Sequence, residues 1–200
     1  MPAVVDHEAC RRAVAEATAE LITCRGIDAV TVRDVARAAG YSTAIISHLF
    51  TSRADLLSHT YRSTLMRARQ RMEAALTAPE GGGLRGYLAA LLPLTADQRG
   101  NWRVWVTFWS MAIANPAFAA EQKRVTRQIT DRLAALLADH GLDEAQARAG
   151  ARRLLILVHG VATQAFFDRD HWPAEEQWRL LDRELTAIGL PPVTGGQGAP

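Results

Sequence analysis

The 200-residue sequence predicts an all-α protein of nine helices. Apolar residues recur at helical spacing in almost every periodic stretch, and no window alternates with the period of two that marks a half-buried strand. Capping residues stand before several of these stretches, and glycine or proline stands after them. Hydrophobic residues make up 48% of the chain, which is enough to form a buried core.

The first predicted helix ends at Gly26 and carries one apolar stripe, formed by Cys10, Val14, Ala17, Leu21 and Cys24. Because both cysteines lie on this stripe, we interpret them as buried structural thiols. On one helix they would lie about 21 Å apart, which is too far for a disulfide.

Two short helices are predicted between residues 31 and 49. Thr31 and Asp34 have the spacing of a capping box, which opens a helix that ends at Gly40. Ser42 can cap the second short helix, at 43–49.

A long helix is predicted at 52–77, opened by a second capping box of Ser52 and Asp55 and ended by the loop at 79–83. The other five helices are expected at 84–94, 101–114, 116–139, 143–167 and 173–188. Asp143 can cap the fourth of these five, and Pro173 suits the first turn of the last.

The positive charge of the chain is concentrated in one early segment. Residues 31–71 hold seven arginines and two acids, which gives +5, whereas residues 1–30 sum to −2 and residues 72–200 to −1. A solvated helix face would explain such an excess, and so would a nucleic-acid-binding surface in a small N-terminal domain.

The two short helices and the glycine turn between them predict a helix-turn-helix, whose second helix enters the major groove of DNA. Ile45, Ile46, Leu49 and Phe50 can pack inward, which leaves the polar side of the helix for DNA. A generic corner between two helices would look similar. The residues expected nearest the bases are Thr43, Ala44, Ser47 and His48, and those expected to position the protein on phosphates or beside the bases are Thr31, Arg33, Tyr41, Ser42 and Arg53.

Residues 9–57 resemble the N-terminal domain of the TetR family of bacterial repressors. The match is carried by Ala17, Gly26, Thr31, Val35, Ala36, Ala39, Gly40, Ser42, Phe50, Arg53, Leu56 and Leu57. The stretch 42–50, and Trp105-x-x-Phe108-Trp109 followed by Asn115-Pro116, resemble the BetI-like subgroup in particular. Departures from the common family pattern are Tyr41 for Val, Ser47 for Tyr, Leu49 for Tyr or His, and Arg53 for Lys.

The resemblance implies a TetR-like fold with a DNA-binding domain at 1–55, an effector-binding and dimerisation domain at 56–190, and a flexible tail at 191–200. It implies a cytoplasmic, ligand-responsive, dimeric repressor of transcription that binds palindromic double-stranded operator DNA. Two alternatives stay open: an architectural or activating DNA binder of this family without an effector, and a helical protein-interaction module.

The helix predicted at 143–167 is apolar on several sides, which favours a partner, most simply a second copy of the chain. A helix wholly inside its own domain would look the same. The residues expected at the dimer interface are Leu154, Leu155, Val158, Val161, Ala162, Ala165, Trp178, Leu181 and Leu185.

Trp102, Trp105 and Trp109 recur at helical spacing, which is typical of core packing but also of a ligand cavity. Tryptophan faces attract quaternary ammonium groups, so the small-molecule effector is expected to be apolar or cationic. The residues expected to bind it are Tyr61, Leu65, Met66, Trp105, Phe108 and Trp109.

Several classes of protein are not expected. The longest aliphatic run, 154–158, is far shorter than a membrane span, and no secretory signal precedes the first helix. None of the six histidines has a metal-ligand spacing, and no nucleophile motif or carboxylate pair stands out. We therefore expect no enzyme, no metal and no cofactor.

Overall fold

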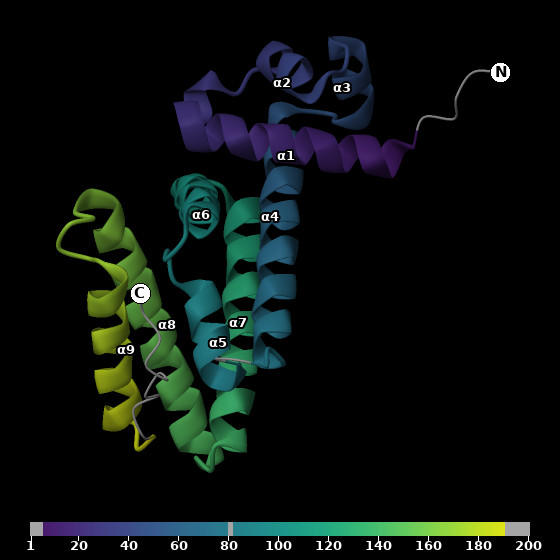
Figure 1. The fold of residues 1–200 in the computed structure, drawn as a ribbon. Helices are drawn as coiled ribbons and strands as arrows, with labels where there is room; N and C mark the ends of the chain where they lie inside the picture. The colour runs from purple at the N-terminus through teal and green to yellow at the C-terminus, as the bar shows by residue number, and fades with distance from the viewer. Residues whose placement is uncertain (1–5, 80–81, 191–200) are drawn as a thin grey trace. The chain divides into compact units, whose positions relative to one another are not determined.

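The computed structural model describes residues 6–79 and 82–190, and within these ranges it contains nine α-helices, a 3-10 turn and no strand (Figure 1). The predicted all-α class is confirmed. The elements are α1 His7–Arg25, η1 Ile27–Ala29, α2 Val32–Ala39, α3 Thr43–Leu49, α4 Arg53–Leu76, α5 Gly83–Leu91, α6 Ala96–Ala114, α7 Pro116–Asp139, α8 Glu144–Phe167 and α9 Ala174–Ala187. The tail expected at 191–200 lies outside the described ranges.

Two predicted boundaries were wrong, both around the connection of α5 to α6. α6 begins five residues earlier than predicted, because Thr95 and Gln98 cap each other: each backbone N–H donates to the other's side chain, at 2.8 and 3.2 Å. α5 ends at Leu91 rather than Leu94. Leu92 is extended because the ring of Pro93 disfavours helical backbone in the residue before it.

The two cysteines are free thiols in different surroundings. Cys10 is buried as predicted, but Cys24 is exposed, so its predicted burial was wrong. Ala15, Thr18 and Ile22 are buried on α1, so the buried face lies further round the helix than the predicted stripe. Cys24 falls at the edge of that face in the last turn.

The chain divides into two compact units. The first contains the residues up to Arg69 together with Arg99–Phe118, and the second contains Gln70–Gln98 together with the residues from Ala119 onward. Three helices, α4, α6 and α7, contribute to both. These units are defined by compactness alone. The predicted boundary at residue 55 separates a DNA-binding domain from an effector-binding domain, and it stays a prediction.

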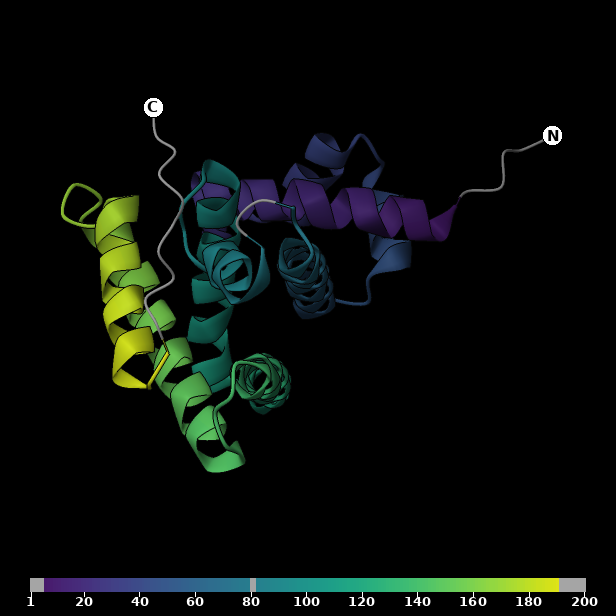
Figure 2. The ribbon, with the colours of Figure 1, turned by 60° about the horizontal axis from the view of Figure 1, so that its bottom comes forward.

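In the first unit, α2 and α3 pack on α1 and on each other (Figures 1 and 2). Their shared core includes the buried side chains of Val14, Val35, Ile46 and Leu56, one from each of α1 to α4. Burying an aliphatic side chain of this size contributes roughly 1.5–3 kcal/mol. This core therefore holds the two short helices in place.

In the second unit, α8 and α9 pack side by side, and Leu154, Leu181 and Leu185 are fully buried. The predicted cap of α8 is confirmed as a complete capping box of Asp143 and Gln146. Pro173 is the N-cap residue of α9 and stands one position before its first turn.

His159 lies on α8 and is half-buried. Burial lowers the pKa of His159 from 6.5 to about 4. Between these two values the unfolded chain binds a proton that the folded chain does not, so folding loses stability as the pH falls through this range.

We therefore predict that His159→Gln makes stability less dependent on pH. Between pH 7 and pH 4 the wild type should lose about 3 kcal/mol more free energy of unfolding than the variant. Urea unfolding at both pH values and one protein concentration measures the difference. Parallel pH profiles for the two proteins would contradict the prediction.

Candidate nucleic-acid interface and aromatic cluster

The helix-turn-helix begins at a cap on α2. The Asp34 N–H donates to the Thr31 hydroxyl oxygen at 3.1 Å, so Thr31 is the N-cap as predicted. The second half of the predicted capping box differs, because the Asp34 carboxylate accepts from the Thr31 hydroxyl rather than from its backbone. This bond is the largest cause that lowers the pKa of Asp34.

The turn between the two helices depends on one glycine. Gly40 has φ 74°, in the left-handed region that glycine adopts without strain, and its N–H donates to the Ala36 carbonyl. Two residues later the Ser42 hydroxyl accepts from the Ile45 N–H at 3.3 Å and caps α3. The chain thus reverses within three residues and brings α3 against α2.

Side chains of α3 divide into a buried and an exposed set. Ile46 and Leu49 are buried, together with Phe50 just after the helix. Ile45 is half-buried against the same core. The residues that α3 leaves exposed include the four that we expected nearest the bases: Thr43, Ala44, Ser47 and His48.

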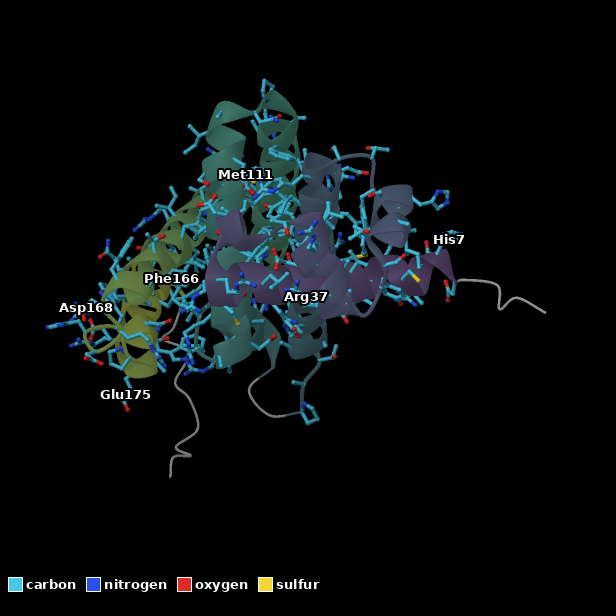
Figure 3. All side chains as sticks on the ribbon, turned by 90° about the horizontal axis from the view of Figure 1, so that it is seen from above. His7, Arg37, Met111, Phe166, Asp168 and Glu175 are labelled. Atoms are coloured by element: carbon cyan, nitrogen blue, oxygen red, sulfur yellow. The ribbon has the colours of Figure 1, made fainter. Side chains whose placement is uncertain are left out.

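Most residues predicted to contact phosphates are exposed residues of the first unit, which Figure 3 shows from above, where Arg37 of α2 is labelled. Thr31, Arg33 and Ser42 are exposed. Tyr41 is half-buried against the core of this unit, and a hydrogen bond with the Cys10 thiol raises the pKa of its phenol.

Arg53 has a role that its charge did not predict. Its Nε–H donates to the Val30 carbonyl at 3.1 Å and its Nη2–H to the Ile27 carbonyl at 2.7 Å. The guanidinium group therefore ties the start of α4 to the turn η1 that leads into α2. The same side chain remains exposed and keeps further N–H groups toward solvent.

Most of the predicted ligand-binding residues belong to the aromatic side chains of α4 and α6 in the first unit, which make two sets of ring contacts and are called the aromatic cluster below. Tyr61 of α4 stacks on Phe108 of α6 with parallel rings 3.6 Å apart. Trp102 meets Trp105 and Trp109 edge-on, with ring centroids 5.1 and 5.7 Å apart. Trp102 was not among the predicted ligand residues, although it shares their helical spacing.

Two predicted members are placed differently. Leu65 is half-buried, whereas the side chain of Met66 is 61% exposed. Tyr61, Leu65 and Ala68 follow one face of α4, and Met66 lies beside that face. Met66 therefore does not join the cluster within a single chain.

Trp105 carries an unsatisfied donor. Its side chain is 8% exposed, and its Nε1 is buried without a hydrogen-bond partner among the described residues. A buried donor without a partner costs about 1–3 kcal/mol. An acceptor atom of a bound molecule would remove that cost.

The residues predicted at the dimer interface lie mostly inside the single chain. All of them except Trp178 are buried within the single chain: Leu154, Leu155, Val158, Val161, Ala162, Ala165, Leu181 and Leu185. They form part of the core around α8 and α9. The sequence does not indicate which side of such an apolar helix faces its own domain, and the large hydrophobic residues that α8 leaves exposed are Ile156 and Phe167.

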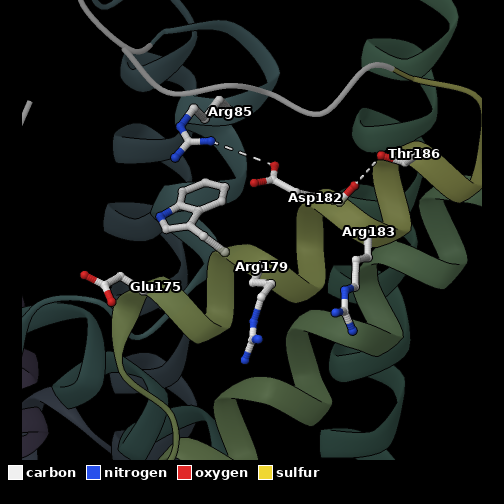
Figure 4. A pocket seen from close by; sticks show the side chains of 7 residues that line it. Arg85, Glu175, Arg179, Asp182, Arg183 and Thr186 are labelled. Atoms are coloured by element: carbon white, nitrogen blue, oxygen red, sulfur yellow. Dashed lines mark hydrogen bonds and ion pairs between the residues drawn. The ribbon is translucent and has the colours of Figure 1, made fainter. Parts of the chain in front are cut away.

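Trp178 lies instead in a surface groove of the second unit, with a volume of about 620 Å³ (Figure 4). The Arg85 guanidinium lies 4.0 Å from the centroid of the Trp178 ring and 3.9 Å from a carboxylate oxygen of Asp182. The groove is thus lined by an internal cation–π contact and an ion pair.

Comparison with protein families now identifies the fold and its role. Residues 14–60 match the model of the bacterial regulatory proteins of the tetR family. Residues 82–190, more than half of the chain, match the model of the C-terminal part of BetI-type transcriptional repressors. The chain belongs to the BetI-type repressors of the TetR family. It is a regulator of transcription and not an enzyme.

Individual relatives agree with this assignment. The HTH-type transcriptional regulator BetI of Paraburkholderia phymatum is 30% identical over 185 residues, which cover 91% of this chain and 94% of the relative. The regulator of the same name from Burkholderia mallei is 31% identical over 164 residues, which cover 80% and 84%.

Solved structures confirm the TetR-like fold. A transcriptional regulator from Rhodococcus sp. Rha1 has a TM-score of 0.79 at 24% identity and covers 89% of this chain and 95% of its own. A regulator from Saccharomonospora viridis, solved in complex with choline, has a TM-score of 0.76 at 24% identity, with coverage of 90% and 96%.

Within the described ranges, no group of three or more His, Cys, Asp or Glu side chains is arranged to hold a metal ion. No helix in those ranges is long and apolar enough to cross a membrane.

Proposed function

We propose that this BetI-type repressor acts as a homodimer that reads palindromic operator DNA with α3 and releases it when a small molecule binds. The observation that carries the proposal is the exposed side of α3, where Thr43, Ala44, Ser47 and His48 stand free on a helix whose other side is buried. Side chains of this size can reach base edges in a major groove. The protein would act in the cytoplasm, on chromosomal DNA.

Phosphate contacts would come from the residues around the two helix starts. Exposed caps at Thr31 and Ser42 lie where backbone N–H groups favour an anion, and Arg33 adds a charge on the first turn of α2. Tyr41, which precedes Ser42 in the chain, and the solvent-exposed N–H groups of Arg53 are the other proposed phosphate contacts. Such contacts orient the protein without reading sequence.

We predict that the protein binds its operator at least about a thousandfold more tightly than a scrambled duplex at physiological salt. His48→Ala and Ser47→Ala should change the preference at one or two base positions, because these side chains lie on the exposed last turn of α3. Fluorescence anisotropy with single-base operator variants measures both effects.

Lys123→Ala is the control, since Lys123 is an exposed cation on α7 of the second unit. It should leave base preference unchanged. Equal affinity of the wild type for operator and scrambled duplex would refute the proposed function.

In the dimer, the outer face of α8 would pair with the same face of a second copy. Ile156 and Phe167 are 72% and 81% exposed, and a Cβ added at Gly160 between them would meet no atom. These three positions follow one side of α8. Two apolar side chains flanking an open glycine suit close helix packing around a two-fold axis.

We predict that Ile156→Glu and Phe167→Glu shift the protein from dimer to monomer and weaken operator binding, because each places a charge in the paired face. Sedimentation equilibrium measures the mass. Ile113→Glu is the matched control, since Ile113 is 89% exposed on α6 of the other unit. A dimer that survives both α8 variants would place the interface elsewhere.

The effector would bind at the aromatic cluster. Three observations support a quaternary ammonium compound that also carries an oxygen acceptor: the gathered tryptophan rings, the unsatisfied Nε1–H of Trp105, and choline bound to the Saccharomonospora viridis relative. Tyr61, which stacks on Phe108, belongs to α4 and would connect this site to that helix. The first turns of α4 contribute Leu56 and Leu57 to the core beneath the helix-turn-helix.

We predict that choline changes the tryptophan emission and releases operator DNA. Trp105→Phe and Trp109→Leu should weaken choline binding by about tenfold or more, because they remove a donor and a cation–π face. Operator affinity without choline should stay within about twofold of wild type.

Trp178→Leu is the control, because Trp178 lies in the groove of the second unit. Full choline response in both cluster variants would move the effector site away from the cluster. Tight operator binding that no small molecule relieves would favour an architectural role instead.

A further inference from the structure

We propose that Arg11 of α1 is a positioning residue that fixes the C-terminal end of the reading helix α3 and thereby sets how well the protein discriminates its operator. The inference rests on the proposed DNA-binding function of α3. It adds a residue that lies outside the helix-turn-helix and does not itself need to touch DNA.

The first contact is a hydrogen bond between distant parts of the chain. An Nη2–H group of Arg11 donates to the backbone carbonyl of Leu49, the last residue of α3. The final carbonyls of a helix lack partners within the helix, and a positive charge is favourable beside them. Arg11 supplies both the donor and the charge.

The second contact is with the residue that follows α3. The Arg11 guanidinium lies 4.8 Å from the centroid of the Phe50 ring, and Phe50 is buried. On α4, His59 lies 5.4 Å from Phe50 between ring centroids. Burial first, and then the Arg11 charge, lower the pKa of His59, so its ring is neutral at physiological pH.

These contacts matter because α3 has only seven residues. Helices shorter than about 12 residues are marginal without tertiary support. At its start α3 has the Ser42 cap, and at its end it has the Arg11 bond. Ser47 and His48 lie in the last turn, directly before Leu49, so their positions depend on the end that Arg11 holds.

Arg11 itself is half-buried and directed at a carbonyl and a ring. A phosphate contact would release counterions and contribute about 0.9 to the slope of log affinity against log salt. A positioning residue contributes nothing to that slope. The salt dependence therefore separates the two roles.

The next residue provides a matched control. Arg12 is exposed on α1 and pairs with Glu8 on the same helix, at 3.9 Å. Arg12→Ala removes the same charge from the same helix as Arg11→Ala but leaves the bond to Leu49 in place.

The experiment compares wild type, Arg11→Ala, Arg11→Lys and Arg12→Ala in anisotropy titrations with operator and scrambled duplexes over a range of salt. Arg11→Ala should weaken operator binding by about ten- to a hundredfold, the effect of losing a bond from a charged donor. Scrambled-duplex affinity and the salt slope should match those of Arg12→Ala. Arg11→Lys keeps a donor but no planar group over Phe50, so it should restore part of the discrimination.

Hydrogen exchange gives a second readout that needs no DNA. The Phe50 N–H donates to the Ile46 carbonyl at 2.9 Å and closes the last turn of α3. This amide should exchange at least about tenfold faster in Arg11→Ala than in Arg12→Ala, and Arg11→Lys should lie between the two. The amides of α6 should be unchanged, which shows that the fold is intact.

Three results would overturn the proposal: unchanged exchange in both Arg11 variants, an operator-to-scrambled ratio equal to that of Arg12→Ala, or a fall of about 0.9 in the salt slope. If Arg11→Ala does not fold, Arg11→Lys decides by the same ratio and exchange rates. The wild type could fail to discriminate its operator while hydrogen exchange at Phe50 still responds to the Arg11 substitutions. That result would refute the proposed function but would support the contact between Arg11 and the end of α3.

Discussion

The helix-turn-helix depends on one constraint: a seven-residue helix cannot hold its own conformation in water. The helix α3 exists because Ile46 and Leu49 are buried in a core to which α1, α2 and α4 also contribute. Burying one side of so short a helix leaves only the opposite side to solvent. The surface offered to DNA is therefore set by the core beneath it, and a loss of packing would remove the surface together with the fold.

The same constraint explains why hydrogen bonds gather at the ends of the short helices. Thr31 and Ser42 cap the starts of α2 and α3, and Gly40 closes the first helix in the left-handed conformation. Arg11 and Arg53 then join segments far apart in the sequence, at the end of α3 and at the turn before α2. Arginine suits this task because its planar group donates several bonds in fixed directions.

The sequence predicted the features that depend on neighbouring residues, and it missed those that depend on distant ones. The caps at Thr31, Ser42 and Asp143 follow from spacings of three residues, so their positions could be read directly. The bonds of Arg11 and Arg53 span 38 and 23–26 residues and leave no periodic trace. Periodicity likewise showed that α8 is apolar but not which of its sides is inward, so core residues were assigned to the dimer interface. The early start of α6 does have a local signal, because Thr95 and Gln98 have the spacing of a capping box.

Burial has a different consequence in the aromatic cluster from the one it has in the helix-turn-helix. The parallel stack of Tyr61 on Phe108 joins α4 to α6, whereas the buried Nε1 of Trp105 on α6 has no acceptor in the part of the chain that the structure describes. A ligand shifts a conformational equilibrium only through a difference in affinity between two forms. An acceptor on the proposed effector would supply such a difference, because it gains a bond only in the form whose donor faces it. Because α4 carries Tyr61 and also contributes Leu56 to the core under α3, the proposed effector site and α3 share one helix, and under the proposed function a change at the cluster would pass along it.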